Sequence, residues 1–386
     1  MKVAGRVGAV PPYPFVEISR KIAAKKAQGI DVISFGIGDP DLPTPPSVLD
    51  ALHKASLDAP NHRYPESEGL PEFRGAVADW YKKRFDVNLD PETEVVSLIG
   101  AKEGIGHAAM AFVEPGDIAL VPDPGYPVYS VGTLFAGGES YLMPLMEGNQ
   151  WFPDLDAIPE DVSNKATIMW LNYPNNPTGA TAERDQFAKA IEFARRHDVV
   201  LMHDACYSEI AYDGYQPLSL LQVEGARDVC VEFHSLSKSY NMTGWRLGMA
   251  VGNPEIIEAL RVIKSNMDSG VPQAIQQMGI AAMDIPDGEI SDRNEIYQRR
   301  RELVVGALRA LGLTVKHPRA SLYVWAGVPE GFTSAGFSER LLEETDVLVS
   351  PGTSYGKWGE GYIRLSLTLS DEQLEKAVDR LSSWSM

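Results

Sequence analysis

Short apolar runs rich in β-branched residues alternate with longer amphipathic stretches from about residue 94 to residue 251. Runs of the first kind are typical of strands, whereas apolar residues three or four positions apart are typical of helices. The predicted strands are residues 94–99, 118–121, 166–172, 199–203, 229–234 and 247–251. Predicted helices lie between several of them, notably 103–113 and 184–197.

This alternation predicts an α/β fold in which a largely parallel sheet is covered by helices on both faces. Ligands of such open sheets bind in the crevice at the carboxyl ends of the strands. Gly100, residues 172–179, Asp204 and residues 235–238 each follow a predicted strand. We therefore expect the functional residues to gather in that crevice.

Two less regular parts flank this block. Residues 1–46 are rich in Pro and Gly, and a charged helical pattern at 289–311 precedes strand-like residues 321–325 and 362–367. A chain of 386 residues is long enough for two cores, because single cores stop growing before about 250–300 residues. The pattern predicts a large domain of residues 47–280 and a smaller α+β domain built from residues 1–46 and 281–386.

The amino-acid composition excludes some classes of binding partner and indicates the cellular compartment. A formal net charge of -18 argues against nucleic acid and anionic membranes, because both would repel such a surface. The only cysteines, Cys206 and Cys230, are too few for a disulfide framework and fit a reducing compartment. No apolar run approaches the ~18 residues of a membrane span. We expect a cytoplasmic protein whose ligands are small molecules.

One lysine stands among hydroxyl groups. Lys238 lies between Ser237 and Ser239, shortly after an apolar run and upstream of Arg246. A lysine amine forms a Schiff base with the aldehyde of pyridoxal phosphate, and the phosphate of that cofactor needs hydroxyl donors and a guanidinium nearby. Ser235, Ser237 and Arg246 could supply these groups. Taken alone, the Ser-x-x-Lys pattern is more typical of a Ser- and Lys-rich surface loop.

Two further candidates follow strands. Asp204 ends an apolar run, so its carboxylate could pair with the pyridinium nitrogen of the cofactor, although a helix N-cap is the alternative. Tyr207 would face the same side if the segment made one turn. In residues 172–179, Asn-Tyr-Pro-Asn-Asn-Pro-Thr-Gly, two X-Pro bonds and a glycine predict a rigid turn that projects Asn176 as a donor. A turn with a purely structural role remains the alternative.

Three weaker signals concern anions and aromatic stacking. Residues 100–104 join a strand to a helix, whose first N–H groups suit a phosphate, and Lys102 could add charge or reach a substrate carboxylate. Tyr126 could stack on the pyridine ring or be an ordinary half-buried tyrosine. Arg364 interrupts the apolar alternation of residues 362–367, so it either binds an α-carboxylate or faces solvent from an edge strand.

The chain resembles the fold-type-I aminotransferases of class I in four motifs taken together. These are Asn-x-Pro-x-Asn-Pro-Thr-Gly, the Asp204/Tyr207 pair, Ser-x-Ser-Lys with Gly-Trp-Arg downstream, and the late Arg364. This resemblance implies pyridoxal 5'-phosphate as cofactor, a mostly parallel seven-stranded sheet in the large domain and a homodimer with the active site at its interface; it implies no metal. It makes Lys238 the Schiff-base lysine, Asp204 the pyridinium partner, and Tyr207 with Asn176 the partners of the phenolic oxygen. The remaining cofactor contacts that it implies are Ser235, Ser237, Arg246 and the Ala101–Lys102 backbone at the phosphate, Tyr126 stacked on the ring, and Tyr64 reaching the phosphate of the neighbouring subunit's cofactor.

Within that family the chain is most similar to the branch that acts on LL-diaminopimelate. The words that carry this similarity are residues 11–13, 36–41, 98–104, 121–129 and 264–266. It implies amino transfer between an L-amino acid and 2-oxoglutarate or glutamate in lysine biosynthesis. The substrate contacts that it implies are Tyr13, Gly38, Lys102, Tyr126, Asn176, Asn266 and Arg364. An alanine or aspartate aminotransferase, or a pyridoxal-phosphate lyase of the same fold, is the alternative, although many aspartate enzymes carry Ser-Gly-Thr where this chain has Gly100-Ala101-Lys102.

Overall fold

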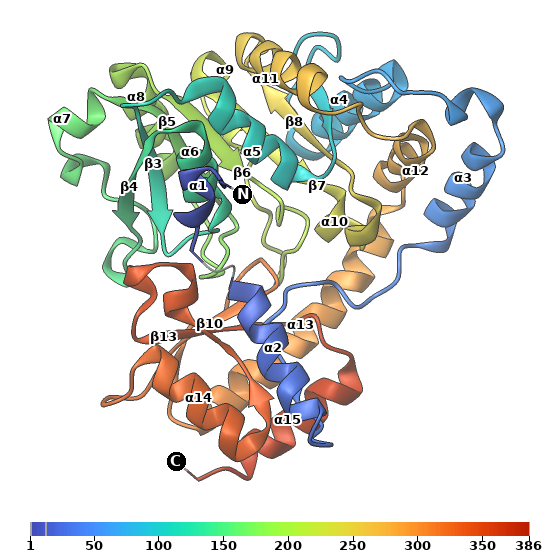
Figure 1. Cartoon of the computed structure of the whole chain (residues 1–386). Helices are drawn as coiled ribbons and strands as arrows, with labels where there is room; N and C mark the ends of the chain where they lie inside the picture. The colour runs from blue at the N-terminus through green and yellow to red at the C-terminus, as the bar shows by residue number, and fades with distance from the viewer. Residues whose placement is uncertain (1, 12–13, 386) are drawn as a thin grey trace.

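The computed structural model describes residues 2–11 and 14–385 (Figure 1). Its main feature is a seven-stranded sheet in which β8 runs antiparallel to both of its neighbours and the other pairs are parallel. In spatial order the strands are β2(Val95–Leu98), β8(Gly248–Gly252), β7(Cys230–Ser235), β6(Val200–Asp204), β5(Ala166–Asn172), β3(Ile118–Asp123) and β4(Glu139–Pro144). The order β7-β6-β5-β3 brings the carboxyl ends of four parallel strands to one edge.

Helices pack on both faces of this sheet, because successive side chains of a strand point to opposite sides. Leu201 packs into a core with helices α4(Pro71–Phe85), α8(Arg184–His197) and α12(Gln273–Met283). Met202, its neighbour, packs into a second core with α5(Ala101–Phe112), α6(Val128–Ala136) and α11(Pro254–Met267). The same alternation sends Asp204 toward the α5 face and His203 toward the α8 face. The remaining helices of this part are α3(Pro46–Ser56), α7(Glu160–Ser163), α9(Ala226–Val229) and α10(Leu236–Ser239), with 3-10 turns η1(Ala59–His62), η2(Glu147–Asn149), η3(Leu155–Ala157), η4(Leu220–Gln222) and η5(Thr243–Trp245).

A smaller sheet lies below the large one in Figure 1. Its strands are, in spatial order, β12(Ser350–Pro351), β13(Tyr362–Ser366), β10(Tyr323–Gly327) and β9(Thr314–Val315), and a separate parallel pair joins β1(Ile33–Ser34) to β11(Val347–Leu348). The accompanying elements are α2(Pro14–Lys26), α13(Asp287–Ala310), α14(Ser334–Thr345), α15(Asp371–Ser382), η6(Gly352–Tyr355) and η7(Lys357–Gly359). A core of its own forms beneath this sheet, with Phe337, Leu341 and Leu374 from α14 and α15. Segments near both ends of the chain thus meet in one body.

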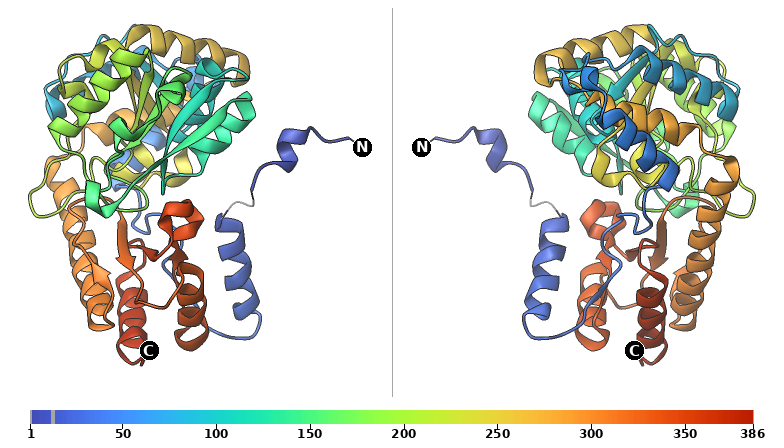
Figure 2. Two further views of the ribbon diagram at one scale, coloured as in Figure 1. Left: turned by 90° about the vertical axis from the view of Figure 1, so that its left-hand side faces the viewer. Right: turned by 90° about the vertical axis from the view of Figure 1, so that its right-hand side faces the viewer.

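Residues 2–11, which include α1(Gly5–Gly8), extend away from the rest of the chain (Figure 2). α1 buries none of its residues, and Val3 and Val7 are largely exposed. Within residues 2–11 and 14–385, no helix is long and apolar enough to cross a lipid bilayer.

The predicted fold class is confirmed, and the predicted elements match closely. The strand at 166–172 and the helix at 184–197 have the predicted bounds, and the other predicted strands shift by one or two residues at their ends. β4 is the strand of the large sheet that the hydrophobic pattern missed, and the two-residue strands β9, β11 and β12 of the smaller part were not predicted either. β4 lies at the edge of the sheet with mostly half-buried residues, so its side chains do not form the continuous apolar run of a central strand.

Candidate active site

A cavity of about 350 Å³ opens where β5, β6 and β7 end, between the start of α5 and the small sheet. Lys238 and Asp204 both line it, together with residues from the segment 37–39 and from β10. The predicted site residues that line this cavity are Gly38, Ala101, Lys102, Tyr126, Asn176, Asp204, Tyr207, Ser235, Ser237, Lys238 and Arg246. The chain therefore folds most of the predicted set into one place.

Lys238 sits in the short helix α10, directly after β7. Ser235 caps this helix, because its Oγ accepts a hydrogen bond from the Ser237 N–H at 3.2 Å. The lysine Nζ donates to the Gly38 carbonyl at 2.6 Å. Burial lowers the pKa of Lys238 to about 8, although the negative charge of Asp39 opposes this shift. Part of the lysine population is thus a neutral amine near neutral pH, which is the nucleophilic form.

Asp204 is the last residue of β6, and its carboxylate accepts two hydrogen bonds. The Tyr129 hydroxyl donates to Oδ2 at 2.7 Å and the Cys206 N–H donates to Oδ1 at 3.2 Å. Tyr129 is itself fixed, because its ring stacks on Trp170 with centroids 4.8 Å apart. The segment after Asp204 forms turns rather than a helix, so the predicted alternative of a helix N-cap is wrong. The arrangement presents a fixed acceptor to any cation in the cavity.

The asparagine tract forms a turn held by its own side chains. Asn172 Oδ1 accepts from the Asn176 N–H at 2.8 Å, and Asn175 Oδ1 accepts from both the N–H and the hydroxyl of Thr178. Both X-Pro bonds of the tract are cis. The Asn176 Oδ1 accepts from Arg364, so its amide NH₂ is the part of the side chain that can donate to a ligand.

Gly100 and Arg246 face each other at the opposite wall. Gly100 has φ 71°, and a Cβ at this position would collide with the guanidinium of Arg246. Arg246 donates to the Ser237 hydroxyl at 3.3 Å and to the Thr243 carbonyl at 2.9 Å. The first N–H groups of α5 begin directly after Gly100. A guanidinium, hydroxyls and a helix N-terminus in one wall suit a phosphate.

Arg364 is fully buried on β13, so the predicted alternative of a solvent-facing arginine is wrong. Its Nη1 donates to Asn176 Oδ1 at 2.9 Å and its Nη2 donates to the Gly36 carbonyl at 2.7 Å. Its Cζ lies 4.1 Å from the ring centroid of Tyr323 and 4.7 Å from that of Tyr355. Arg364 joins the site through Asn176, with its guanidinium plane held by two aromatic rings.

Among the described residues, three predicted contacts do not line this cavity: Tyr64, Asn266 and Arg364, the last of which bonds to Asn176 in its wall. Tyr64 is 86 % exposed, and Asn266 is exposed on α11, where its amide donates to the Val262 carbonyl at 2.8 Å. Tyr13 lies outside the described residues. The assignments of Tyr13, Tyr64, Asn266 and Arg364 as ligand contacts stay predictions.

Sequence reasoning also missed residues that shape the site. Tyr129 contacts Asp204, Tyr323 contacts Tyr207, and Tyr355 contacts Arg364. Asp39 lines the cavity beside Lys238. Tyr129 occupies a helical position in which a buried tyrosine usually serves only the core. A signal was nonetheless present, because a buried tyrosine requires a partner for its hydroxyl.

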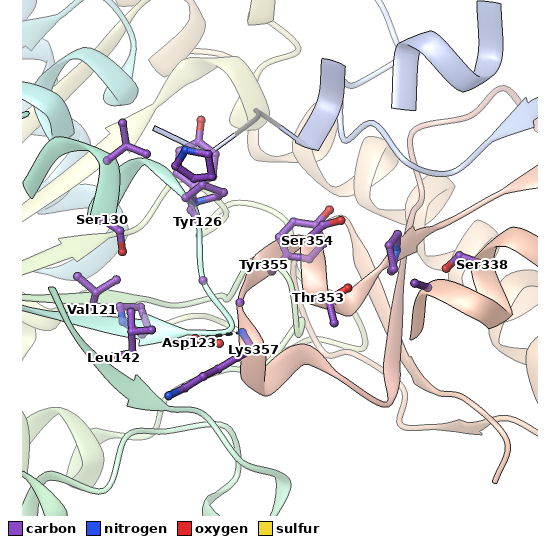
Figure 3. Close-up of a pocket in the computed structure, with 18 of the residues that line it drawn as sticks. Val121, Asp123, Tyr126, Ser130, Leu142, Ser338, Thr353, Ser354, Tyr355 and Lys357 are labelled. Carbon is purple, nitrogen blue, oxygen red and sulfur yellow. Dashed lines mark hydrogen bonds between the residues drawn. The ribbon is translucent and has the colours of Figure 1, made fainter. Parts of the chain in front are cut away.

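A larger cavity of about 710 Å³ lies on the other side of Tyr126 (Figure 3). Apolar side chains such as Val121 and Leu142 form much of its wall. Asp123 closes one end, where its carboxylate accepts from the Lys357 and Trp358 N–H groups at 3.2 and 3.0 Å. Neither Lys238 nor Asp204 lines this cavity, so the smaller one carries the chemistry.

The site combines a half-buried lysine of lowered pKa with a carboxylate and a wall suited to phosphate, at the edge of a mostly parallel sheet, and this combination defines a class of protein. The chain belongs to the aminotransferases of class I and II, whose family model matches residues 30–381. This family depends on pyridoxal phosphate, and the residues of the smaller cavity fit that cofactor by charge, because Gly100 lets the Arg246 guanidinium lie close to the start of α5 at the wall of the cavity.

Particular relatives narrow the likeness further. The chain is 60 % identical to an LL-diaminopimelate aminotransferase of Dehalococcoides mccartyi over 384 residues, which cover 100 % of this chain and 99 % of that one. It is 54 % identical to an LL-diaminopimelate aminotransferase of Moorella thermoacetica, over 99 % of this chain and 98 % of that one. Among solved structures, substrate-bound BacF from Bacillus subtilis has a TM-score of 0.94 at 38 % identity, over 99 % and 98 % of the two chains. A mutant aspartate aminotransferase of Thermus thermophilus has a TM-score of 0.90 at 29 % identity, over 99 % of both chains.

Proposed function

We propose that this protein transfers the amino group between LL-2,6-diaminopimelate and 2-oxoglutarate, with pyridoxal 5'-phosphate bound to Lys238. The observation that carries the chemistry is the half-buried Lys238, whose pKa is lowered, in one cavity with the Asp204 carboxylate. The choice of substrate is supported by relatives that are 50–60 % identical over nearly the whole chain and carry the name LL-diaminopimelate aminotransferase. In the biosynthetic direction glutamate would be the amino donor, and the product would serve lysine synthesis.

The residues would hold the cofactor at three points. Arg246, Ser235, Ser237 and the first N–H groups of α5 would bind the phosphate, because they combine positive charge with several donors. Asp204 would accept from the pyridinium nitrogen, since Tyr129 already fixes its carboxylate. Tyr207 and the NH₂ group of Asn176 would donate to the phenolic oxygen, and the half-buried Tyr126 would stack on the ring.

The remaining chemistry falls to Lys238 and Arg364. Bound pyridoxal phosphate supplies an electron sink that makes the substrate's Cα proton acidic. The neutral Nζ of Lys238 would take that proton and later return it, acting as a general base and acid. Arg364 would hold the α-carboxylate with its planar fork, which fixes the substrate for this transfer. Gly38, Lys102, Tyr13 and Asn266 would surround the rest of the substrate.

We also infer a homodimer. Tyr64 is 86 % exposed although it is a large aromatic residue, and Val3 and Val7 of the N-terminal arm are largely exposed as well. An interface that covers them would bring Tyr64 toward the cofactor phosphate of the other subunit. Two main cores support an inferred large domain of residues 47–280 and a small domain of residues 1–46 and 281–386, although Met283 and Ile285 join the first core and Tyr207, Ile210 and Tyr212 join the second. We place the protein in the cytoplasm, with amino acids and oxo acids as its partners.

A screen of amino donors with 2-oxoglutarate tests the proposal. Purified protein loaded with pyridoxal phosphate is incubated with LL-diaminopimelate, meso-diaminopimelate, aspartate or alanine, and glutamate formation is measured. We expect LL-diaminopimelate to react with the highest kcat/KM. Activity with alanine or aspartate alone would overturn the substrate assignment, and elimination without glutamate formation would identify a lyase instead.

A further inference from the structure

Tyr323 contacts several residues of the site, although the proposed function gives it no role. It begins β10, is 3 % exposed and lines the smaller cavity. Its hydroxyl lies 3.0 Å from the hydroxyl of Tyr207, and the two rings meet edge to face with centroids 5.5 Å apart. A Cβ added to Gly38 would collide with the same hydroxyl. Tyr323 is thus packed between the cofactor side of the site and the segment that faces Lys238.

The ring of Tyr323 also lies against Arg364. Strands β10 and β13 pair antiparallel with Tyr323 opposite Ser366, which makes Arg364 a diagonal neighbour on the same face of the sheet. The Arg364 Cζ is 4.1 Å from the ring centroid. A guanidinium at this distance from a buried ring is held by a cation–π contact, so its plane is fixed. One side chain therefore contacts both Tyr207 and Arg364.

The direction of the hydrogen bond between the two hydroxyls follows from a count of protons. A phenol has a single proton to donate. If Tyr207 donated to Tyr323, it would have no proton left for the phenolic oxygen of the cofactor. The role proposed for Tyr207 therefore requires Tyr323 to be the donor in this pair.

We propose that Tyr323 positions two other residues of the site, Tyr207 and Arg364. Its hydroxyl directs the Tyr207 proton toward the cofactor. Its ring holds Arg364 toward the substrate carboxylate. This inference rests on the proposed function, because it presumes bound pyridoxal phosphate. The two roles belong to different parts of the Tyr323 side chain, the hydroxyl and the ring, so substitutions can test them separately. Tyr323→Phe removes the hydroxyl and keeps the ring, whereas Tyr323→Leu removes both.

The first measurement follows the visible absorbance of the bound cofactor as a function of pH in the full-length, loaded protein. A hydrogen bond to the phenolic oxygen favours its anionic form, so a less well directed Tyr207 raises the pKa at which the bound cofactor takes up a proton. For Y323F we expect proton binding to tighten about three- to tenfold, as for the loss of one hydrogen bond. Y297F is the control, because Tyr297 is fully buried and its hydroxyl makes no hydrogen bond among the described residues.

The second measurement is the binding of glutarate, a dicarboxylate that cannot react, by titration calorimetry. We expect Y323F to bind glutarate within twofold of the wild type, and Y323L to bind it roughly five- to thirtyfold more weakly because the cation–π contact is lost. Circular dichroism checks that each variant is folded. Y323F keeps the packing of the ring, so it decides the hydroxyl half even if Y323L does not fold.

The outcomes separate this inference from the proposed function. A wild-type protein that gains no visible band with pyridoxal phosphate would overturn the proposed function itself. A normal wild-type band combined with an unchanged cofactor pKa in Y323F would overturn the role of the Tyr323 hydroxyl alone. Glutarate binding by folded Y323L at the wild-type affinity would overturn the role of its ring.

Discussion

Arg364 donates a hydrogen bond of 2.9 Å to the side-chain oxygen of Asn176, a residue 188 positions earlier in the chain. The arginine lies on the small sheet and the asparagine follows a strand of the large one. This bond ties the residue proposed to bind the substrate carboxylate to a residue proposed to contact the cofactor. Movement of the small sheet relative to the large one would act on both residues together.

Arg364→Lys should lower kcat/KM by roughly 100-fold, or about 3 kcal/mol, because a lysine keeps the charge but loses the fork that bonds Asn176 and a carboxylate. Steady-state kinetics with LL-diaminopimelate measures this loss, and fluorescence titration should show cofactor binding within about twofold of the wild type. Arg299→Lys is the control, since Arg299 is exposed and pairs with Asp371 at 2.9 Å. Wild-type kinetics in Arg364→Lys would remove this residue from the site.

The pKa of Lys238 sets the pH dependence of cofactor loading. Its value of about 8 lies below the usual value because the amine is buried. The rate at which the cofactor-free protein takes up pyridoxal phosphate should therefore rise about tenfold per pH unit up to pH 8 and level off above it. Stopped-flow absorbance between pH 6 and 10 measures this rate. A midpoint near that of a solvated lysine would contradict the prediction.

Asp39→Asn should move this midpoint to lower pH. The carboxylate of Asp39 favours the charged ammonium of Lys238, so its removal lowers the pKa of the lysine further. The same stopped-flow series measures the shift. Asp185→Asn, on the exposed side of α8, changes the net charge equally and should leave the midpoint in place.

The elements and residues that could be predicted are those for which the neighbouring residues in the sequence indicate the structure. β5 and α8 have the predicted bounds, since a continuous apolar run and a regular amphipathic period each favour one structure. Lys238 and Gly100 follow strands and Asp204 ends one, and the carboxyl edge of the sheet then brings them together. Much of the cavity could be predicted in this way.

The contacts between distant residues could not be predicted from local pattern. The pairing of Tyr129 with Asp204 depends on how α6 lies against β6, and the contact of Tyr323 with Arg364 depends on the register of β10 and β13. Neither the packing of α6 against β6 nor the register of β10 and β13 is determined by the residues around a single position. Tyr64 and Asn266 do not line the cavity of the single chain, and no local pattern around either residue predicted this.

Gly356→Ala should destabilise the contact between the two sheets. Gly356 has φ 139°, and an added Cβ would collide with the Asp123 carboxylate that accepts from the Lys357 and Trp358 N–H groups (Figure 3). Gly361→Ala is a matched control, because Gly361 also has a positive φ, 85°, but open space around its Cα. We expect Gly356→Ala to lose about 2 kcal/mol more unfolding free energy than the control in urea. Equal losses would mean that backbone strain alone accounts for both.

The last prediction concerns Glu232, which is fully buried on the α8 face of the sheet, away from the cavity. Its carboxylate accepts from His203 Nδ1 at 2.7 Å, from the Tyr81 hydroxyl at 3.0 Å and from the Leu220 N–H at 2.7 Å. The other nitrogen of His203 faces the Tyr173 carbonyl at 3.1 Å, which can only accept. His203 is therefore held at both ring nitrogens, one of them against the Glu232 carboxylate.

This pair makes stability depend on pH with a definite sign. Burial alone would raise the pKa of Glu232, but the hydrogen bonds and positive charges of His203 and His234 lower it well below its usual value. A lowered pKa stabilises the fold above the unfolded value of about 4.3, and this contribution is lost as the pH falls below it. Glu232→Gln should cost about 3 kcal/mol at pH 7, because it breaks a buried ion pair. In urea unfolding, the gap between wild type and variant should narrow from pH 6 to pH 3, whereas Glu372→Gln, which removes an exposed partner of Lys376, should show no such gap. A gap that stays constant across this range would mean that Glu232 has the same pKa in the folded and unfolded states, and a gap that widens as the pH falls would mean that Glu232 is protonated in the fold.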